Sequence, residues 1–168
     1  RLDTAKRALE LLGASTQSQA EKLAGDLKAL NDSRKDLTAK GTTEAIRLIE
    51  ETDLGQDKVL VVYLPDCHES LAGIIAGRIR ERYFRPCFVL TDGEEGVKGS
   101  GRSIPGYHMF EEMTKVAELF TKFGGHPMAA GLSIPTENVE ILRKRLNENC
   151  RLTDEDLVPK LSYDAVLP

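Results

Sequence analysis

A run of six consecutive apolar residues at positions 59–64 constrains the fold more than any other feature of the sequence. An uninterrupted apolar and β-branched run of this length predicts a strand that is buried on both faces. Residues 71–83 then repeat apolar side chains at helical spacing, with Ser70 or the residues just before it as the expected cap, and a second apolar run follows Pro86 at 87–90. Strand, helix and strand within about 35 residues predict a βαβ unit with parallel strands and a right-handed crossover.

The sequence before this unit predicts helices only. Apolar residues recur at helical spacing over residues 2–12, and Gly13 is the expected C-cap. Ser15 or Thr16 is expected to cap a second, long helix that continues to about residue 51, with its many charges on a solvated face. Gly41 and the Thr42-Thr43 pair are expected to break or kink this helix near its middle.

The sequence after residue 90 predicts shorter elements. In chain order we expect a turn at 92–96, a glycine-rich segment at 97–103, a helix at about 109–121, a loop at 123–127, a strand or a short helix turning into a strand at 128–134, a helix at 137–149 capped by Thr136, and a linker leading into a strand at 153–168. The predicted fold class is α/β: a helical arm over residues 1–53, a compact mixed-sheet domain over 54–150 and a linker over 151–168.

Composition excludes several classes of protein. The chain has 23 Lys and Arg against 27 Asp and Glu, a net charge of −4, which argues against a generally basic nucleic-acid coat but leaves room for a local basic groove. Aromatic residues are sparse, at 5%, and Trp is absent, so base-stacking platforms are not indicated. No apolar run reaches the 18 or so residues of a membrane span, and the amphipathic start does not resemble a signal peptide.

The cysteines indicate the redox compartment of the chain, and the two ends of the sequence indicate whether it is part of a longer protein. Cys67, Cys87 and Cys150 are an odd number without CxxC spacing, so neither a disulfide framework nor a zinc site is predicted, and a reducing cytoplasm is expected. The chain begins with Arg rather than Met and ends in a strand-like segment, so we expect it to be cut from something longer.

The first candidate binding segment is Gly99-Ser100-Gly101-Arg102-Ser103. Glycines without a Cβ allow backbone N–H groups to approach an anion, Arg binds phosphate bidentately, and serine hydroxyls add hydrogen bonds. The segment is neither a Walker A loop nor a dinucleotide-binding fingerprint. A glycine-rich turn or a bulged strand with an ordinary surface Arg explains the same pattern.

The second candidate is Gly124-Gly125-His126-Pro127. Two glycines before a histidine present its imidazole on a tight loop, where it can donate to a phosphate oxygen or act as an acid or base. A histidine that packs in a turn is the alternative. A single His without a neighbouring carboxylate is poor evidence for a metal site, so no metal ligand is predicted.

Two further segments carry charge. Asp66-Cys67-His68-Glu69 follows the first strand, at the sheet edge where ligands commonly bind, although carboxylates there also suit a helix start. A nucleophilic Cys67 lacks an identifiable base. The basic stretch Arg78 to Arg85 can steer a polyanion or form a solvated face.

With these motifs placed, the sequence resembles the RecJ family of single-strand-specific exonucleases. The resemblance depends on three motifs in the same order as in the family: residues 68–86, residues 98–103 and residues 123–132. Together they resemble the DHHA1 domain of that family. The helical arm before them and the segment after them, which resembles the approach to an oligonucleotide-binding barrel, also fit the family. The sequence departs from the family at Cys67, where an aromatic residue is expected, and at Ser70, where a glycine is expected.

The resemblance implies 5′-to-3′ hydrolysis of single-stranded DNA in repair and recombination. It implies that Gly99, Ser100, Gly101, Arg102 and Ser103, with Gly124, Gly125 and His126, bind substrate phosphates, His126 being a possible accessory to catalysis. The two Mn²⁺ or Mg²⁺ ions of the family belong to a DHH domain that this chain lacks, so the chain itself has no catalytic or metal-binding residue and is expected to be inactive. Its expected partners are single-stranded DNA and the DHH and oligonucleotide-binding domains of its own protein, with no membrane; the oligomeric state is left open.

Two other functions stay open at this point. One is a phosphodiesterase of the same superfamily that acts on short oligonucleotides or cyclic dinucleotides, whose C-terminal domain also carries a glycine-rich Arg motif and a Gly-Gly-His motif. The other is a module that binds single strands without chemistry.

Overall fold

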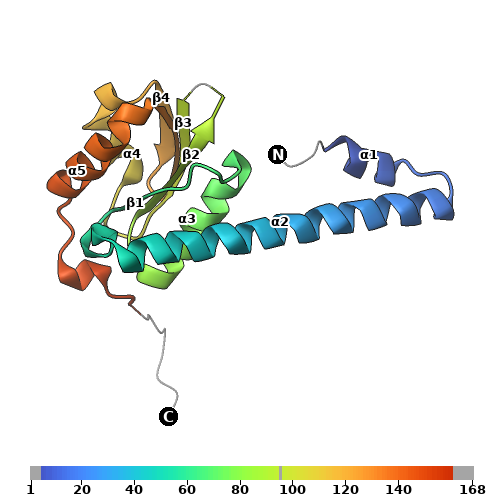
Figure 1. Ribbon diagram of the computed structural model, residues 1–168, viewed down its shortest axis with the longest axis horizontal. Coiled ribbons are helices and arrows are strands. Elements are labelled where there is room, and N and C mark those ends of the chain that lie inside the picture. Colours follow the sequence, from blue (N-terminus) through green and yellow to red (C-terminus); the bar gives the residue numbers. More distant parts are fainter. Residues whose placement is uncertain (1–4, 95, 161–168) are drawn as a thin grey trace, which may run out of the picture.

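The computed structural model describes residues 5–160 except residue 95, and shows a five-stranded sheet with helices on both faces beside a long projecting helix (Figure 1). Its helices and strands, in chain order, are α1 Lys6–Leu12, α2 Gln17–Glu51, β1 Leu60–Tyr63, α3 Glu69–Tyr83, β2 Cys87–Gly93, β3 Gly96–Arg102, α4 Met109–Thr114, β4 Lys122–His126, β5 Ala129–Ile134 and α5 Val139–Asn149. Short 3₁₀ turns cover Asp53–Gln56, Ala117–Leu119, Thr136–Asn138 and Asp154–Leu157.

The sheet is mixed, with the strand order β1-β2-β3-β5-β4. β1 and β2 are parallel, with Leu60 opposite Cys87, and the other three pairs are antiparallel. The predicted parallel βαβ unit and the predicted α/β class are therefore confirmed. β1 and β4 form the two edges, whereas the glycine-rich β3 is the central strand.

Alternate residues of the central strands supply two separate cores, because successive side chains of a strand point to opposite faces. Cys87 and Val89 of β2 pack with α3 and with the domain end of α2. Phe88 and Leu90 pack with α4 and α5 on the other face. Each buried strand is thus apolar on both sides, which is the physical reason for the uninterrupted apolar runs.

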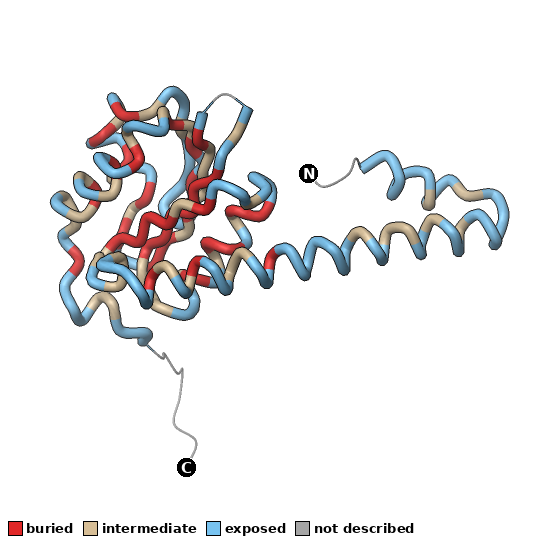
Figure 2. Tube along the Cα trace, viewed as in Figure 1, coloured by how far each residue is buried: buried red, intermediate tan, exposed pale blue. Residues whose placement is uncertain are grey.

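α2 is one continuous helix, so the predicted break at Gly41 is wrong. Its N-cap is Thr16, whose hydroxyl accepts a hydrogen bond from the Gln19 N–H. Gly41 instead permits close packing, since a Cβ there would lie 2.6 Å from Cδ1 of Ile75 in α3. The first half of α2 projects from the domain as an exposed arm, and α1 folds back along it (Figures 1 and 2).

Three further local predictions need correction. The helix expected at 109–121 ends at Thr114, because the chain turns there to begin β4. The segment expected as a loop at 123–127 is instead mostly strand, since it pairs with β5. A 3₁₀ turn over residues 136–138 replaces the predicted Thr136 cap of α5. The cap of α3, expected at Ser70 or just before it, is His68.

Side chains of α5 fix the outer edge of the sheet. The Asn147 side-chain oxygen accepts from the Val59 N–H at 3.0 Å, and its amide donates to the Val59 carbonyl at 2.9 Å. Arg143 pairs with Asp57 at 2.5 Å and with Asp53 at 3.0 Å, and these contacts raise the pKa of its guanidinium. α5 therefore pairs the backbone of the residue just before β1 and holds the segment between α2 and β1.

Within the described ranges, no helix is both long and apolar enough to span a membrane. Residues 161–168, which include the strand predicted beyond the linker, lie outside the described residues.

Candidate phosphate-binding face

β3 turns its glycines toward one face of the sheet and its polar residues toward the other. A Cβ at Gly99 would lie 2.3 Å from Leu90 Cδ2, and one at Gly101 would lie 2.4 Å from Met109 Sδ, so both glycines face the α4 and α5 core. Lys98, Ser100 and Arg102 alternate with them and face the side of α3. The predicted phosphate-binding segment is thus a central strand rather than a loop.

The register of the sheet places the two predicted motifs on the same face. Arg102 is directly opposite Ala129, and Ala129 is directly opposite His126. Residues that are directly opposite each other in a sheet point to the same face. Arg102 and His126, which are 24 positions apart in the sequence, therefore lie two strands apart in one row, about 10 Å between backbones.

Two more rows of the same kind follow along the strands. Ser100, Gly131 and Gly124 form the middle row, and Lys98, Ser133 and Lys122 form the last. We call these nine positions, including Arg102, Ala129 and His126, the open face, because all of them are partly or fully exposed. Sequence reasoning missed Lys98, Lys122 and Gly131. Their alternation with the motif residues was the signal that could have found them.

Two shallow depressions hollow the open face. One, of about 300 Å³, lies between the start of α3 and β3, and the other, of about 350 Å³, lies between β5 and β4. They meet at Gly131 and Leu132, which line both. The open face is therefore a continuous shallow surface rather than a deep pocket.

α3 covers the sheet next to the open face and positions Arg102. A Cβ at Gly73 of α3 would lie 2.8 Å from Arg102 Nη2 and 3.5 Å from Ser100 Cβ. Arg102 Nη1 donates to its own neighbour, the Gly101 carbonyl, at 2.7 Å. The guanidinium thus lies beside the bare backbone of α3, and within the described residues its other donors make no further hydrogen bond.

The start of α3 adds a carboxylate to this face. Glu69 Oε2 is 2.7 Å from Lys98 Nζ, and this contact lowers the pKa of the Glu69 carboxyl. His68 caps the helix, its Nδ1 accepting from the Ser70 N–H at 3.2 Å. The segment predicted as either a ligand edge or a helix start therefore does form a helix start.

Three of the predicted phosphate ligands have other roles in this structure. β3 lies between two antiparallel neighbours, so the Gly99 and Gly101 backbones belong to the sheet ladder and are not an anion-binding loop. Ser103 is only 1% exposed, and its hydroxyl donates to the Tyr107 carbonyl at 2.7 Å. Ser100, Arg102 and His126 keep side chains on the open face.

The basic stretch on α3 is largely engaged with the protein itself. Arg82 pairs with Glu50 of α2 at 3.2 Å, and Arg80 pairs with Glu81 at 3.4 Å. Arg85 donates to the backbone carbonyls of Gly55 and Asp57, both at 2.8 Å. These contacts favour a structural role over the steering of a polyanion.

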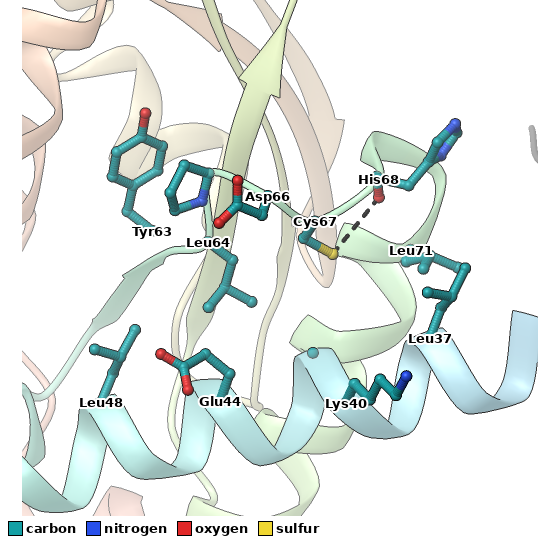
Figure 3. A pocket seen from close by; sticks show the side chains of 12 residues that line it. Leu37, Lys40, Glu44, Leu48, Tyr63, Leu64, Asp66, Cys67, His68 and Leu71 are labelled. Atoms are coloured by element: carbon teal, nitrogen blue, oxygen red, sulfur yellow. Dashed lines mark hydrogen bonds between the residues drawn. The ribbon is translucent and has the colours of Figure 1, made fainter.

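A separate cavity of about 590 Å³ lies between α2 and the loop after β1 (Figure 3). Lys40 and Glu44 reach it from α2, and Asp66 and Cys67 from the loop. Burial raises the pKa of the Cys67 thiol, so this cysteine is not an activated nucleophile. Sequence reasoning missed the cavity, because it depends on how α2 packs against the domain.

Nowhere in residues 5–160, residue 95 aside, do three or more His, Cys, Asp or Glu side chains gather in a way that could hold a metal ion. The described part of the chain therefore does not fit a metal centre of its own.

The fold and the site together define a mixed α/β domain whose sheet is partly uncovered on one face, next to a long connecting helix. The DHHA1 domain family model matches residues 56–152. The chain therefore belongs to the DHHA1 domain family.

Curated relatives carry the name single-stranded-DNA-specific exonuclease RecJ. The protein of Bacillus subtilis (strain 168) is 39% identical over 170 residues, which cover 99% of this chain and 22% of the relative. That of Escherichia coli (strain K12) is 37% identical over 175 residues, 99% of this chain and 30% of the relative. The chain thus spans less than a third of the length of these two relatives.

Solved structures agree with this similarity. Exonuclease RecJ bound to manganese matches with a TM-score of 0.80 and 29% identity, over 91% of this chain and 38% of that one. RecJ from Thermus thermophilus in complex with Mg²⁺ matches with a TM-score of 0.76 and 28% identity, over 86% of this chain and 22% of that one. Structures of this family were therefore determined with either divalent metal.

Proposed function

We propose that this chain is the substrate-binding part of a 5′-to-3′ exonuclease specific for single-stranded DNA, acting in DNA repair and recombination. The observation that carries the proposal is the alignment of Arg102 and His126 in one row of the open face, from motifs far apart in the sequence. The names of the curated relatives support the choice of substrate.

In this proposal the open face holds the phosphates of the substrate. The Arg102 guanidinium binds one phosphate through its free donors, since planar Arg matches phosphate oxygens bidentately. Ser100 donates a hydroxyl hydrogen bond from the same strand, and His126 binds the phosphate near the scissile bond. Backbone contacts of this kind position a strand without reading its sequence.

Hydrolysis itself belongs, in this proposal, to a DHH domain outside this chain that holds two Mn²⁺ or Mg²⁺ ions. The DHH domain and an oligonucleotide-binding domain are the proposed partners within the same protein. The division of the chain into 1–53, 54–150 and 151–168 remains our prediction. A cytoplasmic location is also proposed, with the three free thiols in its support.

Binding at low salt tests the proposal. We expect the chain to bind a labelled single-stranded oligonucleotide weakly, because few phosphates are neutralised, and Arg102→Ala to abolish this binding. Arg145→Ala, on the opposite side of the sheet, is the matched control. Binding that survives Arg102→Ala would place the substrate elsewhere.

Activity provides a second test. The purified chain is expected to release no nucleotides, and Mn²⁺-dependent release that Arg102→Ala abolishes would contradict this. In the longer protein, activity on long single strands would exclude an enzyme restricted to very short oligonucleotides or cyclic dinucleotides.

A further inference from the structure

The last row of the open face, Lys98, Ser133 and Lys122, contains two lysines that the sequence analysis did not assign to phosphate binding. Lys98 of β3 and Lys122 of β4 both stand opposite Ser133, and they therefore point to the same side of the sheet as Arg102 and His126. Along each strand, this row lies four residues from the row of Arg102 and His126, which corresponds to about 13 Å.

This separation fits a single strand that runs along β3 and β5. Stacked nucleotides rise by about 3.4 Å each, so about four nucleotides span the two rows, and fewer are needed when the strand is extended. A dinucleotide is too short to reach both rows. A strand held at Arg102 therefore presents another phosphate near Lys98 and Lys122.

The surface between the two rows leaves room for the strand. Among the described residues, a Cβ at Gly124 would meet nothing within 4 Å, and one at Gly131 would meet only the Gly99 carbonyl oxygen at 3.9 Å. Neither glycine has a positive φ. Internal packing therefore does not require glycine at these two positions, and Ser100 beside them is small.

The charges of this row are unequal. Lys122 is exposed and, in the described part of the chain, forms no ion pair, whereas Lys98 lies 2.7 Å from the Glu69 carboxylate. A phosphate that approaches Lys98 competes with Glu69. The carboxylate also repels the phosphate directly.

We propose that Lys98 and Lys122 bind a second phosphate of the same single strand, and that Glu69 weakens this contact by pairing with Lys98. The strand then runs from the Arg102–His126 row, across Gly131, to the Lys98–Lys122 row. This inference rests on the proposed function, and it adds the path of the strand and a residue that limits its affinity.

Lys122→Gln tests the second contact in the 168-residue chain, with Lys144→Gln at an exposed position of α5 as the matched control for charge. We compare a dinucleotide with a hexanucleotide of deoxythymidine by titration at several salt concentrations, following backbone amide signals by NMR. Lys122→Gln is expected to lower the hexanucleotide salt slope by about 0.7, the contribution of one phosphate contact. It is expected to leave dinucleotide binding unchanged.

The outcomes separate this inference from the proposed function. If Lys122→Gln behaves like Lys144→Gln, or weakens both oligonucleotides equally, the second contact is wrong even where Arg102→Ala abolishes binding. If neither oligonucleotide shifts the signals of Ser100 and Arg102, the proposed function and this inference fail together.

Glu69→Gln gives a test of opposite sign. Removing the carboxylate takes away a competitor of the phosphate for Lys98 and a direct repulsion, so the hexanucleotide is expected to bind several-fold more tightly at low salt, and the gain should be smaller in the double variant with Lys98→Gln. Glu81→Gln, at the other end of α3, is the control. Unchanged or weaker binding by Glu69→Gln would overturn the role given to Glu69.

Discussion

Arg102 occupies space that Gly73 leaves free: a Cβ at residue 73 would lie 2.8 Å from Arg102 Nη2 and 3.5 Å from its Cζ. The contact joins the middle of α3 to the central strand of the sheet. A glycine inside a helix destabilises it by roughly 0.5–1 kcal/mol relative to alanine, so a packing or functional reason is expected. Here the reason is the position of a guanidinium.

Gly73→Ala is therefore expected to weaken oligonucleotide binding through a displaced Arg102. Gly77→Ala is the matched control, because it lies one turn further along α3 and its Cβ would meet nothing within 4 Å. The control should raise the free energy of unfolding by about 0.5–1 kcal/mol and leave binding unchanged. Urea unfolding and oligonucleotide titration measure both effects. Equal binding by the two variants would show that Arg102 does not depend on Gly73.

Alanine substitutions of Gly131 in β5 and Gly99 in β3 are expected to affect the free energy of unfolding differently. Gly131→Ala is expected to leave the free energy of unfolding unchanged or slightly raised, but to weaken oligonucleotide binding, since its new methyl group stands on the open face. Gly99→Ala should be destabilising by about 1–3 kcal/mol, because its Cβ would lie 2.3 Å from Leu90 in the core. A destabilised Gly131→Ala would show instead that this glycine serves the fold.

Asn147→Ala should destabilise the domain although alanine favours the helix. The change removes both hydrogen bonds to the Val59 backbone and leaves a part-buried N–H and carbonyl unpaired. We expect a loss of about 1–3 kcal/mol in the free energy of unfolding, measured with urea. Glu148→Ala on the same helix, expected to change it by no more than about 0.5 kcal/mol, is the control. A neutral Asn147→Ala would mean that water replaces the side chain at this edge.

The phenol of Tyr63 is expected to ionise at a higher pH than an ordinary tyrosine. Its hydroxyl donates to Asp92 Oδ1, and this hydrogen bond, with burial, raises the pKa of the phenol to about 12. A tyrosine in the unfolded chain has a pKa of about 10. The contribution of the Tyr63–Asp92 hydrogen bond to the stability of the folded state is therefore complete below about pH 10, and it is lost as the pH rises toward 12. The difference in phenolate absorbance between the wild type and Tyr63→Phe measures this pKa, and Asp92→Asn should lower it. A pKa near 10 in the wild type would show that the Asp92 contact does not form in solution.

The sequence was sufficient for the elements whose signal is local. The βαβ unit follows from two apolar runs around an amphipathic helix, and Thr16 and Gly13 mark the helix ends where the structure has them. β4 was missed because Gly-Gly-His has little preference for a strand. Its strand conformation comes from pairing with β5, which no local pattern records.

The candidate site was predictable residue by residue but not as a surface. Arg102 and His126 are recognisable from their motifs, whereas their common row depends on the register of three strands. Ser103 was predicted to be a ligand because its burial and its hydrogen bond to the Tyr107 carbonyl are tertiary features that the local sequence does not show. Gly41 was predicted to break or kink α2 because the residue that it packs against, Ile75, belongs to another helix and cannot be recognised from the local sequence.

The unbroken α2 turns a small rotation into a large displacement. Its domain end is held through Ala45 and Ile49, and the 25 residues from Gln17 to Gly41 span about 36 Å. A tilt of a few degrees where Gly41 meets Ile75 moves the far end of this lever by a few ångströms. A larger residue at position 41, whose Cβ would meet Ile75, is therefore expected to change where the far end of α2 lies relative to the sheet.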